Sequence, residues 1–248
     1  MADTSRPHHL PNLRADRQPP HPSWLPRQRR GITPQMIGRY PDFDVLTTTD
    51  SWDEATRQVV LARLEPPGPL RFFTVAEEPT LRAFCDIVLA QDREPRVPVA
   101  EFVDAKLADG QLDGYQYADM PDDRQTWRLV LCGLDEAARE RYGKESFAAA
   151  EVATQLALVD QFCRARLRGG SWAQLNVSRA WSVCMRMTLS AFYSHPWAWN
   201  EIGFGGPAYP RGFMRLGGPS GPAAAREPFE TRGALDKDPV ELVQEEGE

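Results

Sequence analysis

Long apolar runs are missing from this sequence. The stretch Phe147-Ala148-Ala149-Ala150 is followed at once by Glu151, whereas a transmembrane helix needs about 20 consecutive apolar residues. No apolar core of a secretory signal peptide follows the N-terminus, and the twin arginines Arg29-Arg30 lead into the polar, proline-containing residues 31–35. The sequence therefore predicts a cytoplasmic protein without a membrane span.

A positive charge excess and a phosphate-binding loop are missing as well. The formal net charge is −6, the pI is near 5.4, and only 3 of the 29 basic residues are lysine. An acidic chain is a poor binder of phosphate backbones, so we expect no nucleic-acid partner. The glycine-rich stretch 203–206 follows helical sequence rather than a strand, and Pro207 removes an amide that a phosphate cradle needs.

Histidine and cysteine are scarce where a metal or catalytic site would need them. The four cysteines are Cys85, Cys132, Cys163 and Cys184. They are far apart and form no C-x-x-C, which favours four buried free thiols over a zinc site; one disulfide is the alternative. His195 is the only histidine outside the first 41 residues, and no G-x-S-x-G occurs. We therefore expect neither a catalytic set nor a metal site, the alternative being His195 and Glu201 as acid and base.

The chain divides by composition into two tails and a helical domain. Residues 1–41 hold eight prolines and seven arginines against two aspartates, which predicts a disordered basic tail; ordering along an acidic partner is the alternative. Residues 217–248 begin with loop chemistry and end acidic, which predicts a second disordered tail. The range 42–216 between them is predicted to be one helical domain.

Capping boxes and apolar stripes predict the helices of that domain. Ser51-x-x-Glu54 and Thr74-x-x-Glu77 are capping boxes, each followed by an apolar stripe of helical period. We expect helices over about 51–64, 74–89, 98–110, 121–142, 149–167 and 171–194. The stripe of the second is Leu81, Phe84, Cys85, Val88 and Leu89. Leu70 to Phe73 is the best strand candidate but is short, so the predicted fold is all-α, an irregular array of about six helices.

Aromatic residues, glycine and proline concentrate between His195 and Phe213. Pro196 is suited to start a short helix that Gly203 ends, and Trp197 and Trp199 would then lie on opposite faces. Burying both indoles needs a second surface, from another loop or from another protein. Trp, Tyr and Arg are the residues that interface hot spots use. A partner-binding surface is therefore one interpretation, and an aromatic lid over the core is the other.

This segment resembles the end of the gluconate 2-dehydrogenase subunit 3 family. The resemblance rests on three stretches, Phe192 to Pro196, Trp199 to Pro207 and Pro210 to Gly212. Weaker similarity comes from Phe72-Phe73-Thr74, Leu81 to Val88, Arg96 to Val99, Asp104-x-Lys106-Leu107 and Tyr40 to Leu64. The likeness spans roughly residues 40–216.

The resemblance implies an accessory subunit that is not an enzyme by itself. Such small helical subunits carry no cofactor and help to fold, stabilise and export a large FAD-binding partner of the glucose–methanol–choline (GMC) oxidoreductase class. That partner oxidises a sugar, sugar acid or glycoside, often with a c-type cytochrome as electron acceptor. The expected partner-binding residues are His195, Trp197, Trp199, Asn200, Glu201, Phe204, Gly205, Gly206, Tyr209 and Arg211.

The missing apolar part of a twin-arginine signal departs from the family pattern. Either the complex stays in the cytoplasm, or the chain reaches the periplasm or cell envelope with a partner that carries the signal. The alternative function is a general helical protein-interaction module without a redox partner.

Overall fold

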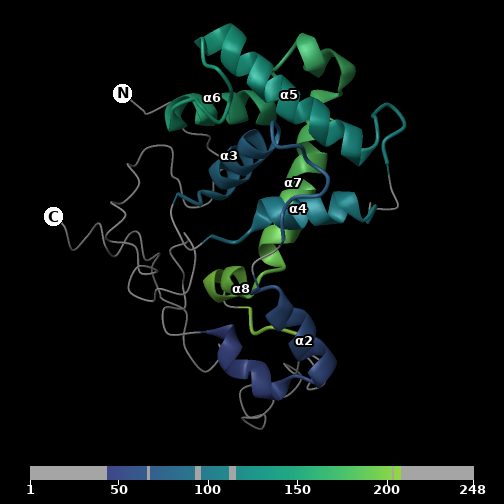
Figure 1. The fold of residues 1–248 in the computed structure, drawn as a ribbon, viewed down its shortest axis with the longest axis vertical. Helices are drawn as coiled ribbons and strands as arrows, with labels where there is room; N and C mark the ends of the chain where they lie inside the picture. Colours follow the sequence, from purple (N-terminus) through teal and green to yellow (C-terminus); the bar gives the residue numbers. More distant parts are fainter. Residues whose placement is uncertain (1–43, 66–67, 93–95, 112–115, 203, 208–248) are drawn as a thin grey trace, which may run out of the picture. The chain divides into compact units, whose positions relative to one another are not determined.

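The computed structural model describes residues 44–65, 68–92, 96–111, 116–202 and 204–207, which form seven α-helices and two 3-10 helices and contain no strand (Figure 1). In chain order these are η2 (Val45–Ser51), α2 (Glu54–Ala62), α3 (Glu78–Leu89), α4 (Val99–Ala108), α5 (Asp123–Tyr142), α6 (Val152–Cys163), η3 (Gly170–Gln174), α7 (Val177–Tyr193) and α8 (Pro196–Ile202). The predicted all-α class is confirmed. The predicted tails at 1–41 and 217–248 lie outside the described residues.

The described residues fall into two compact units. The first unit comprises 68–92, 98–111 and 116–191, and the second comprises 44–65, 96–97, 192–202 and 204–207. The first unit thus holds η3 and α3 to α6 with most of α7, and the second holds η2, α2, α8 and the last two residues of α7. The sequence predicts one helical domain over 42–216.

Aromatic rings from four helices and η3 fill the core of the first unit. Phe84 of α3 lies edge-on to Trp127 of α5, with ring centroids 6.0 Å apart. Phe162 of α6 contacts Trp172 at 4.9 Å and Trp181 of α7 at 5.2 Å. The predicted apolar stripe of α3 is buried in full, at Leu81, Phe84, Cys85, Val88 and Leu89. The helical period in the sequence therefore identified the buried face of this helix correctly.

A close approach between a helix and an indole ring links α5 to η3. The Trp172 indole Nε1 donates a 3.0 Å hydrogen bond to the Gly133 carbonyl in the middle of α5. A Cβ atom at position 133 would lie 2.6 Å from the Trp172 ring. Glycine is therefore the residue that lets this ring lie against the backbone of α5.

The predicted helices are all somewhat longer than the observed ones, and two of them differ most. The helix expected over 149–167 ends at Cys163, because Ala165 takes a left-handed conformation with φ 51°. The helix expected over 171–194 is interrupted: η3 ends at Gln174, and α7 begins only at Val177. The Asn176 side chain accepts from the Arg179 amide at 3.3 Å, so it caps the new helix start.

A small apolar cluster forms the core of the second unit. It contains Val45, Trp52, Val60 and Trp199, with Leu46 and Phe204 packed against it. The predicted capping role of Ser51 is wrong, because Ser51 ends η2 and Asp53 caps α2 by accepting from the Thr56 amide at 3.1 Å. Val60 is the buried residue of α2, while the neighbouring Val59 is exposed.

All four cysteines are free thiols. Cys85 and Cys184 are buried, Cys163 is half-buried and Cys132 is exposed, so the expectation of burial holds for two of the four. Burial raises the pKa of the Cys85 and Cys184 thiols well above the ordinary value, which keeps both protonated and unreactive at neutral pH.

Candidate functional site

The aromatic segment near the C-terminus lies in the second unit. As predicted, Pro196 begins a short helix, α8. Trp199 is only 6% exposed and belongs to the apolar cluster of that unit. Trp197 is half-buried, and its ring lies edge-on to the His195 ring at 4.7 Å. The core of this unit therefore buries one indole almost completely and leaves part of the other accessible.

Trp199 is held by polar as well as apolar contacts. Its indole Nε1 donates to the Tyr193 carbonyl at 2.6 Å, and its ring meets the Phe204 ring edge-on at 5.4 Å. The Arg63 guanidinium lies over the same indole, 5.9 Å from the ring centroid. Arg63 also donates to the Ser194 carbonyl at 2.7 Å. These contacts join the end of α2 to the turn between α7 and α8.

Asn200 joins α8 to residues far away in the sequence. Its side chain is fully buried; Oδ1 accepts from the Val45 amide at 2.7 Å, and Nδ2 donates to the Asp44 carboxylate at 3.1 Å. Asp44 also accepts from the Leu46 amide at 3.1 Å. One amide side chain thus satisfies a free N–H at the start of η2 and orients its capping carboxylate.

Gly205 and Gly206 are both buried. Gly206 has φ 86°, and a Cβ atom there would lie 2.8 Å from the Trp52 ring and 3.0 Å from the Val45 side chain. A side chain at this position would therefore be strained and would collide with the apolar cluster. The two glycines let the backbone after α8 run directly against that cluster.

His195 occupies the junction between α7 and α8 and is only 1% exposed. Its Nδ1 accepts from the Trp197 amide at 3.2 Å, so the neutral ring carries its proton on Nε2. Burial lowers the pKa of His195 to about 4; the nearby Arg63 charge lowers it too, and a hydrogen bond with the Arg63 backbone opposes them. At neutral pH this imidazole is uncharged and serves the helix junction.

Three of the ten expected partner-binding residues lie outside what the structure describes. These are Tyr209, Arg211 and the side chain of Glu201. The other seven lie together in the second unit, where Phe204 and Trp197 are half-buried and the rest are buried. Their assignment to a partner stays a prediction.

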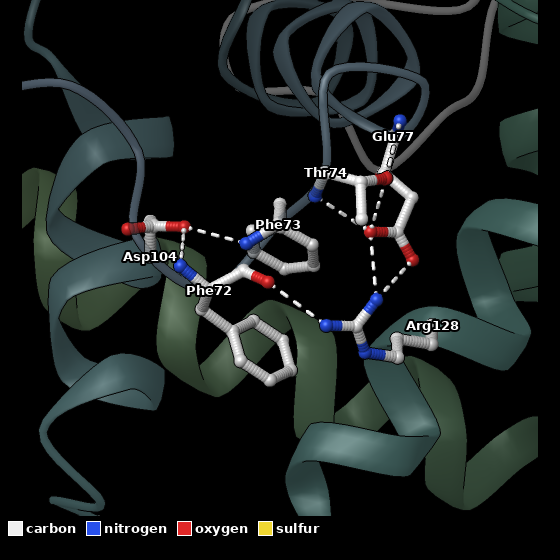
Figure 2. Close-up of polar contacts among 6 residues, drawn as sticks. All are labelled: Phe72, Phe73, Thr74, Glu77, Asp104 and Arg128. Carbon is white, nitrogen blue, oxygen red and sulfur yellow. Dashed lines mark hydrogen bonds and ion pairs between the residues drawn. The ribbon is translucent and has the colours of Figure 1, made fainter.

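A second organised region lies in the first unit, in the loop 71–77 before α3 (Figure 2). The carboxylate of Asp104, a residue of α4 that is 2% exposed, accepts from three successive backbone amides. Its Oδ2 binds the Arg71 amide at 2.6 Å. Its Oδ1 binds the Phe72 and Phe73 amides, both at 2.9 Å. A single buried anion therefore fixes the backbone of the loop entrance.

The exit of the same loop is fixed by a capping box and a guanidinium. Glu77 Oε2 accepts from the Thr74 amide and hydroxyl, both at 2.8 Å, and the Glu77 amide donates to Thr74 Oγ1 at 3.3 Å. Figure 2 shows how Arg128 of α5 then reaches both Glu77 oxygens and the Phe72 carbonyl, at 2.8 Å each. The predicted capping box is confirmed.

Sequence reasoning found the capping box but missed Asp104 and Arg128. A signal for Asp104 was present, because it interrupts the buried stripe that Ala100, Val103 and Leu107 form. A carboxylate on a buried helix face needs several hydrogen-bond donors, which here are backbone amides. Arg128 gave no such signal, since an arginine beside the buried Trp127 reads as a solvated side chain.

Within the described ranges, no three His, Cys, Asp or Glu side chains are arranged to hold a metal ion. In the same part of the chain, no helix has the length and apolar character that crossing a membrane requires.

Comparison with known proteins gives one family. Neither a curated protein nor a solved structure matches the chain. The family model for gluconate 2-dehydrogenase subunit 3 matches residues 76–206. This range includes Glu77, Asp104 and Arg128 and extends through α8 to Gly206, whereas the weaker similarity noted for Tyr40 to Leu64 lies outside it. More than half of the chain is matched, and the chain therefore belongs to the gluconate 2-dehydrogenase subunit 3 family.

Proposed function

We propose that this chain is a non-catalytic accessory subunit that binds and stabilises a large FAD-dependent dehydrogenase of the GMC class. The observation that carries the proposal is the family match over residues 76–206, which assigns the chain to a dehydrogenase subunit. The FAD belongs to the large subunit in this proposal, and the substrate is a sugar, sugar acid or glycoside. A c-type cytochrome is the proposed electron acceptor where one is present.

The state of the ionisable groups supports a non-catalytic role. Asp104 accepts from three backbone amides, and the His195 Nδ1 lone pair is already used by the Trp197 amide. The buried thiols of Cys85 and Cys184 have raised pKa values. Each of these groups serves the fold rather than standing ready for proton transfer or nucleophilic attack.

The expected partner-binding segment contributes to this function in two ways. Trp199, Asn200 and Gly206 are buried, so they shape the second unit and act on a partner through that shape. Trp197 and Phe204 keep part of their surface accessible and are proposed to contact the large subunit directly. A partner that binds only the folded chain stabilises it by mass action, and the folded chain stabilises the partner in return.

The experiment is a tagged pull-down of the full chain from its native host. We expect a yellow eluate in which a second, larger chain carries the flavin absorption bands and is identified by peptide sequencing as a dehydrogenase. The complex, and not the isolated chain, should then oxidise a sugar or sugar acid with an artificial electron acceptor. A colourless eluate, or a partner without flavin, would refute the proposal and favour a general interaction module.

Trp197→Ala sharpens this experiment, with Gln58→Ala on the exposed face of α2 as its matched control. Truncating a half-buried indole at an interface is expected to weaken the complex by about 2 kcal/mol. The control should bind normally, because Gln58 is exposed and its side-chain amide donates to Glu54 of its own helix. Equal binding by both variants would remove Trp197 from the interface.

A further inference from the structure

One residue fixes the first turn of α8. The His195 carbonyl accepts from the Ala198 and Trp199 amides at 3.0 and 3.3 Å, and the His195 ring Nδ1 accepts from the Trp197 amide at 3.2 Å. Pro196, at the start of the helix, has no amide hydrogen. The three amides that follow Pro196 therefore all bind His195, which sets the direction in which α8 leaves the junction.

The end of α2 holds His195 from its other side. The second ring nitrogen of His195, Nε2, donates to the Arg63 backbone carbonyl. The Arg63 guanidinium donates in turn to the Ser194 carbonyl at 2.7 Å. Arg63 is half-buried, and burial lowers its pKa, so these contacts hold a charged group partly out of water. An imidazole bound at both nitrogens keeps one orientation, and the backbone of the junction is fixed with it.

Trp197 is the accessible residue of this arrangement. Its indole is half-buried and lies edge-on to the His195 ring at 4.7 Å. Among the described residues its Nε1–H has no acceptor, whereas the indoles of Trp172 and Trp199 each donate to a backbone carbonyl. An indole with accessible surface and an available N–H is suited to a binding contact. His195 is only 1% exposed, so a partner cannot reach it directly.

We propose that His195 is a positioning residue for partner binding and acts on the large dehydrogenase subunit through Trp197. By fixing the first turn of α8 and packing against the indole, it presents the accessible part of Trp197 in one orientation. Less conformational entropy is then lost when the complex forms, which favours association. This inference rests on the proposed function, and it changes the expected role of His195 from direct contact to indirect positioning.

The test is a double-mutant cycle between His195 and Trp197 in the full-length chain. Wild type, His195→Gln, Trp197→Ala and the double variant are each tagged and titrated against the flavin-bearing large subunit recovered from the native host. We expect His195→Gln to weaken binding about tenfold when Trp197 is present. In the Trp197→Ala background the same change should weaken binding by about twofold or less, because the side chain that His195 positions is absent.

A conservative variant separates positioning from a general effect on the fold. Asparagine carries an acceptor close to the position of the imidazole Nδ1, where it can accept from the Trp197 amide, whereas the glutamine amide extends towards the position of Nε2. His195→Asn should therefore recover most of the affinity that His195→Gln loses. The reverse order would show that the bond to Arg63 matters more than the bond to Trp197, and would contradict the proposal.

Thr48→Ala is the matched control for stability. Thr48 is a buried residue of η2 whose hydroxyl donates to the Val45 carbonyl at 2.7 Å, so its loss weakens the second unit without removing a contact to the junction. It should bind normally at a temperature at which melting curves show every variant folded. If His195→Gln does not fold, Arg63→Met replaces it in the cycle, because this change removes the hydrogen bond to Ser194 and leaves the imidazole in place.

The outcomes separate this inference from the proposed function. If wild type recovers the flavoprotein but His195→Gln loses the same fold in both backgrounds, the positioning role is wrong and the proposed function stands. The same conclusion follows if Thr48→Ala loses as much affinity as His195→Gln, or if Trp197→Ala binds normally. Failure of wild type to recover a flavin-bearing chain would overturn the proposed function and this inference together.

Discussion

Two irregular segments of this molecule are held by opposite kinds of interaction. The loop 71–77 is held by charged side chains that bind its backbone, chiefly Asp104 and Arg128. The segment 194–207 is held by the side chains that it contributes, above all Trp199 and Asn200, which are buried in the second unit. The loop buries Phe73 but leaves Val75 in solvent, whereas the segment 194–207 buries the side chains that hold it.

This difference decides which side chains stay accessible. The many aromatic residues of the C-terminal segment suggest an interface. Trp199 and Phe204, however, pack in the apolar cluster of the second unit. The loop has a less conspicuous composition, yet it presents Val75 at 87% exposure on a fixed backbone. The comparison can be tested by substitutions that remove either a side chain that binds the loop backbone or a buried side chain of the C-terminal segment.

Removing the anion that holds the loop should have the largest effect. Asp104→Ala leaves the amides of residues 71 to 73 without their acceptor, and we expect a loss of about 5 kcal/mol in the free energy of unfolding of the first unit. Asp104→Asn should lose less, because its amide oxygen can still accept from Phe72 and Phe73. Hydrogen exchange followed by mass spectrometry should show faster exchange in the loop. Unchanged exchange there would contradict the role given to Asp104.

Removing the indole at the centre of the second unit should lower the free energy of unfolding somewhat less than Asp104→Ala does. Trp199→Ala creates a cavity beside Val60 and Trp52, and we expect a loss of about 4 kcal/mol, measured by chemical denaturation. Trp197→Ala is the matched control. Its indole is only half-buried, so its removal should lower the free energy of unfolding much less. Equal losses for the two tryptophans would show that the segment is not held by its buried side chains.

Acid should loosen the second unit through His195. Because the pKa of His195 is about 4 in the folded chain and about 6.5 when solvated, the unfolded state binds the proton first as the pH falls. Its contribution is complete above about pH 6.5 and is lost progressively towards pH 4, amounting to about 3 kcal/mol. Thermal melting of wild type and His195→Gln between these pH values measures it. Parallel curves for the two proteins would refute this assignment.

The capping box should contribute the smallest of these effects. Thr74→Ala removes the hydroxyl that accepts from the Glu77 amide, and we expect a loss of about 1 kcal/mol in the free energy of unfolding. Thr74→Ser keeps the hydroxyl and should retain most of the stability. A larger loss for Ser than for Ala would mean that the methyl group, rather than the cap, is what matters at this position.

Local signals in the sequence predict the helices well. The stripe from Leu81 to Leu89 identifies the buried face of α3, and Gly143 ends α5 in a left-handed conformation, as its position indicates. The start of α2 is misplaced because Ser51 and Asp53 are both suitable capping residues, and tertiary contacts of η2 decide between them. The break before α7 has a local signal in its capping residue, Asn176, but it also depends on how Trp172 packs against α5, which is a tertiary contact.

The polar contacts are harder to predict, because their partners are distant in sequence. Asn200 binds Val45 across 155 positions, and Asp104 binds amides more than 30 residues away. The unusual composition of the segment drew attention to Trp199 and Asn200 together. It did not show which backbone and side-chain groups these two residues bind. The resemblance did predict the family, since the family model matches residues 76–206.

The contact between Gly133 and Trp172 couples these two positions, so a substitution at one changes which residues are tolerated at the other. Replacing a mid-helix glycine by alanine ordinarily stabilises a helix by about 1 kcal/mol. Here the added methyl would lie 2.6 Å from the Trp172 ring, so the same substitution is unfavourable until residue 172 becomes smaller. Evolution must therefore change the tryptophan before the glycine, and relatives that keep the tryptophan should keep the glycine. A stabilising design that replaces helix glycines one at a time should leave this one in place.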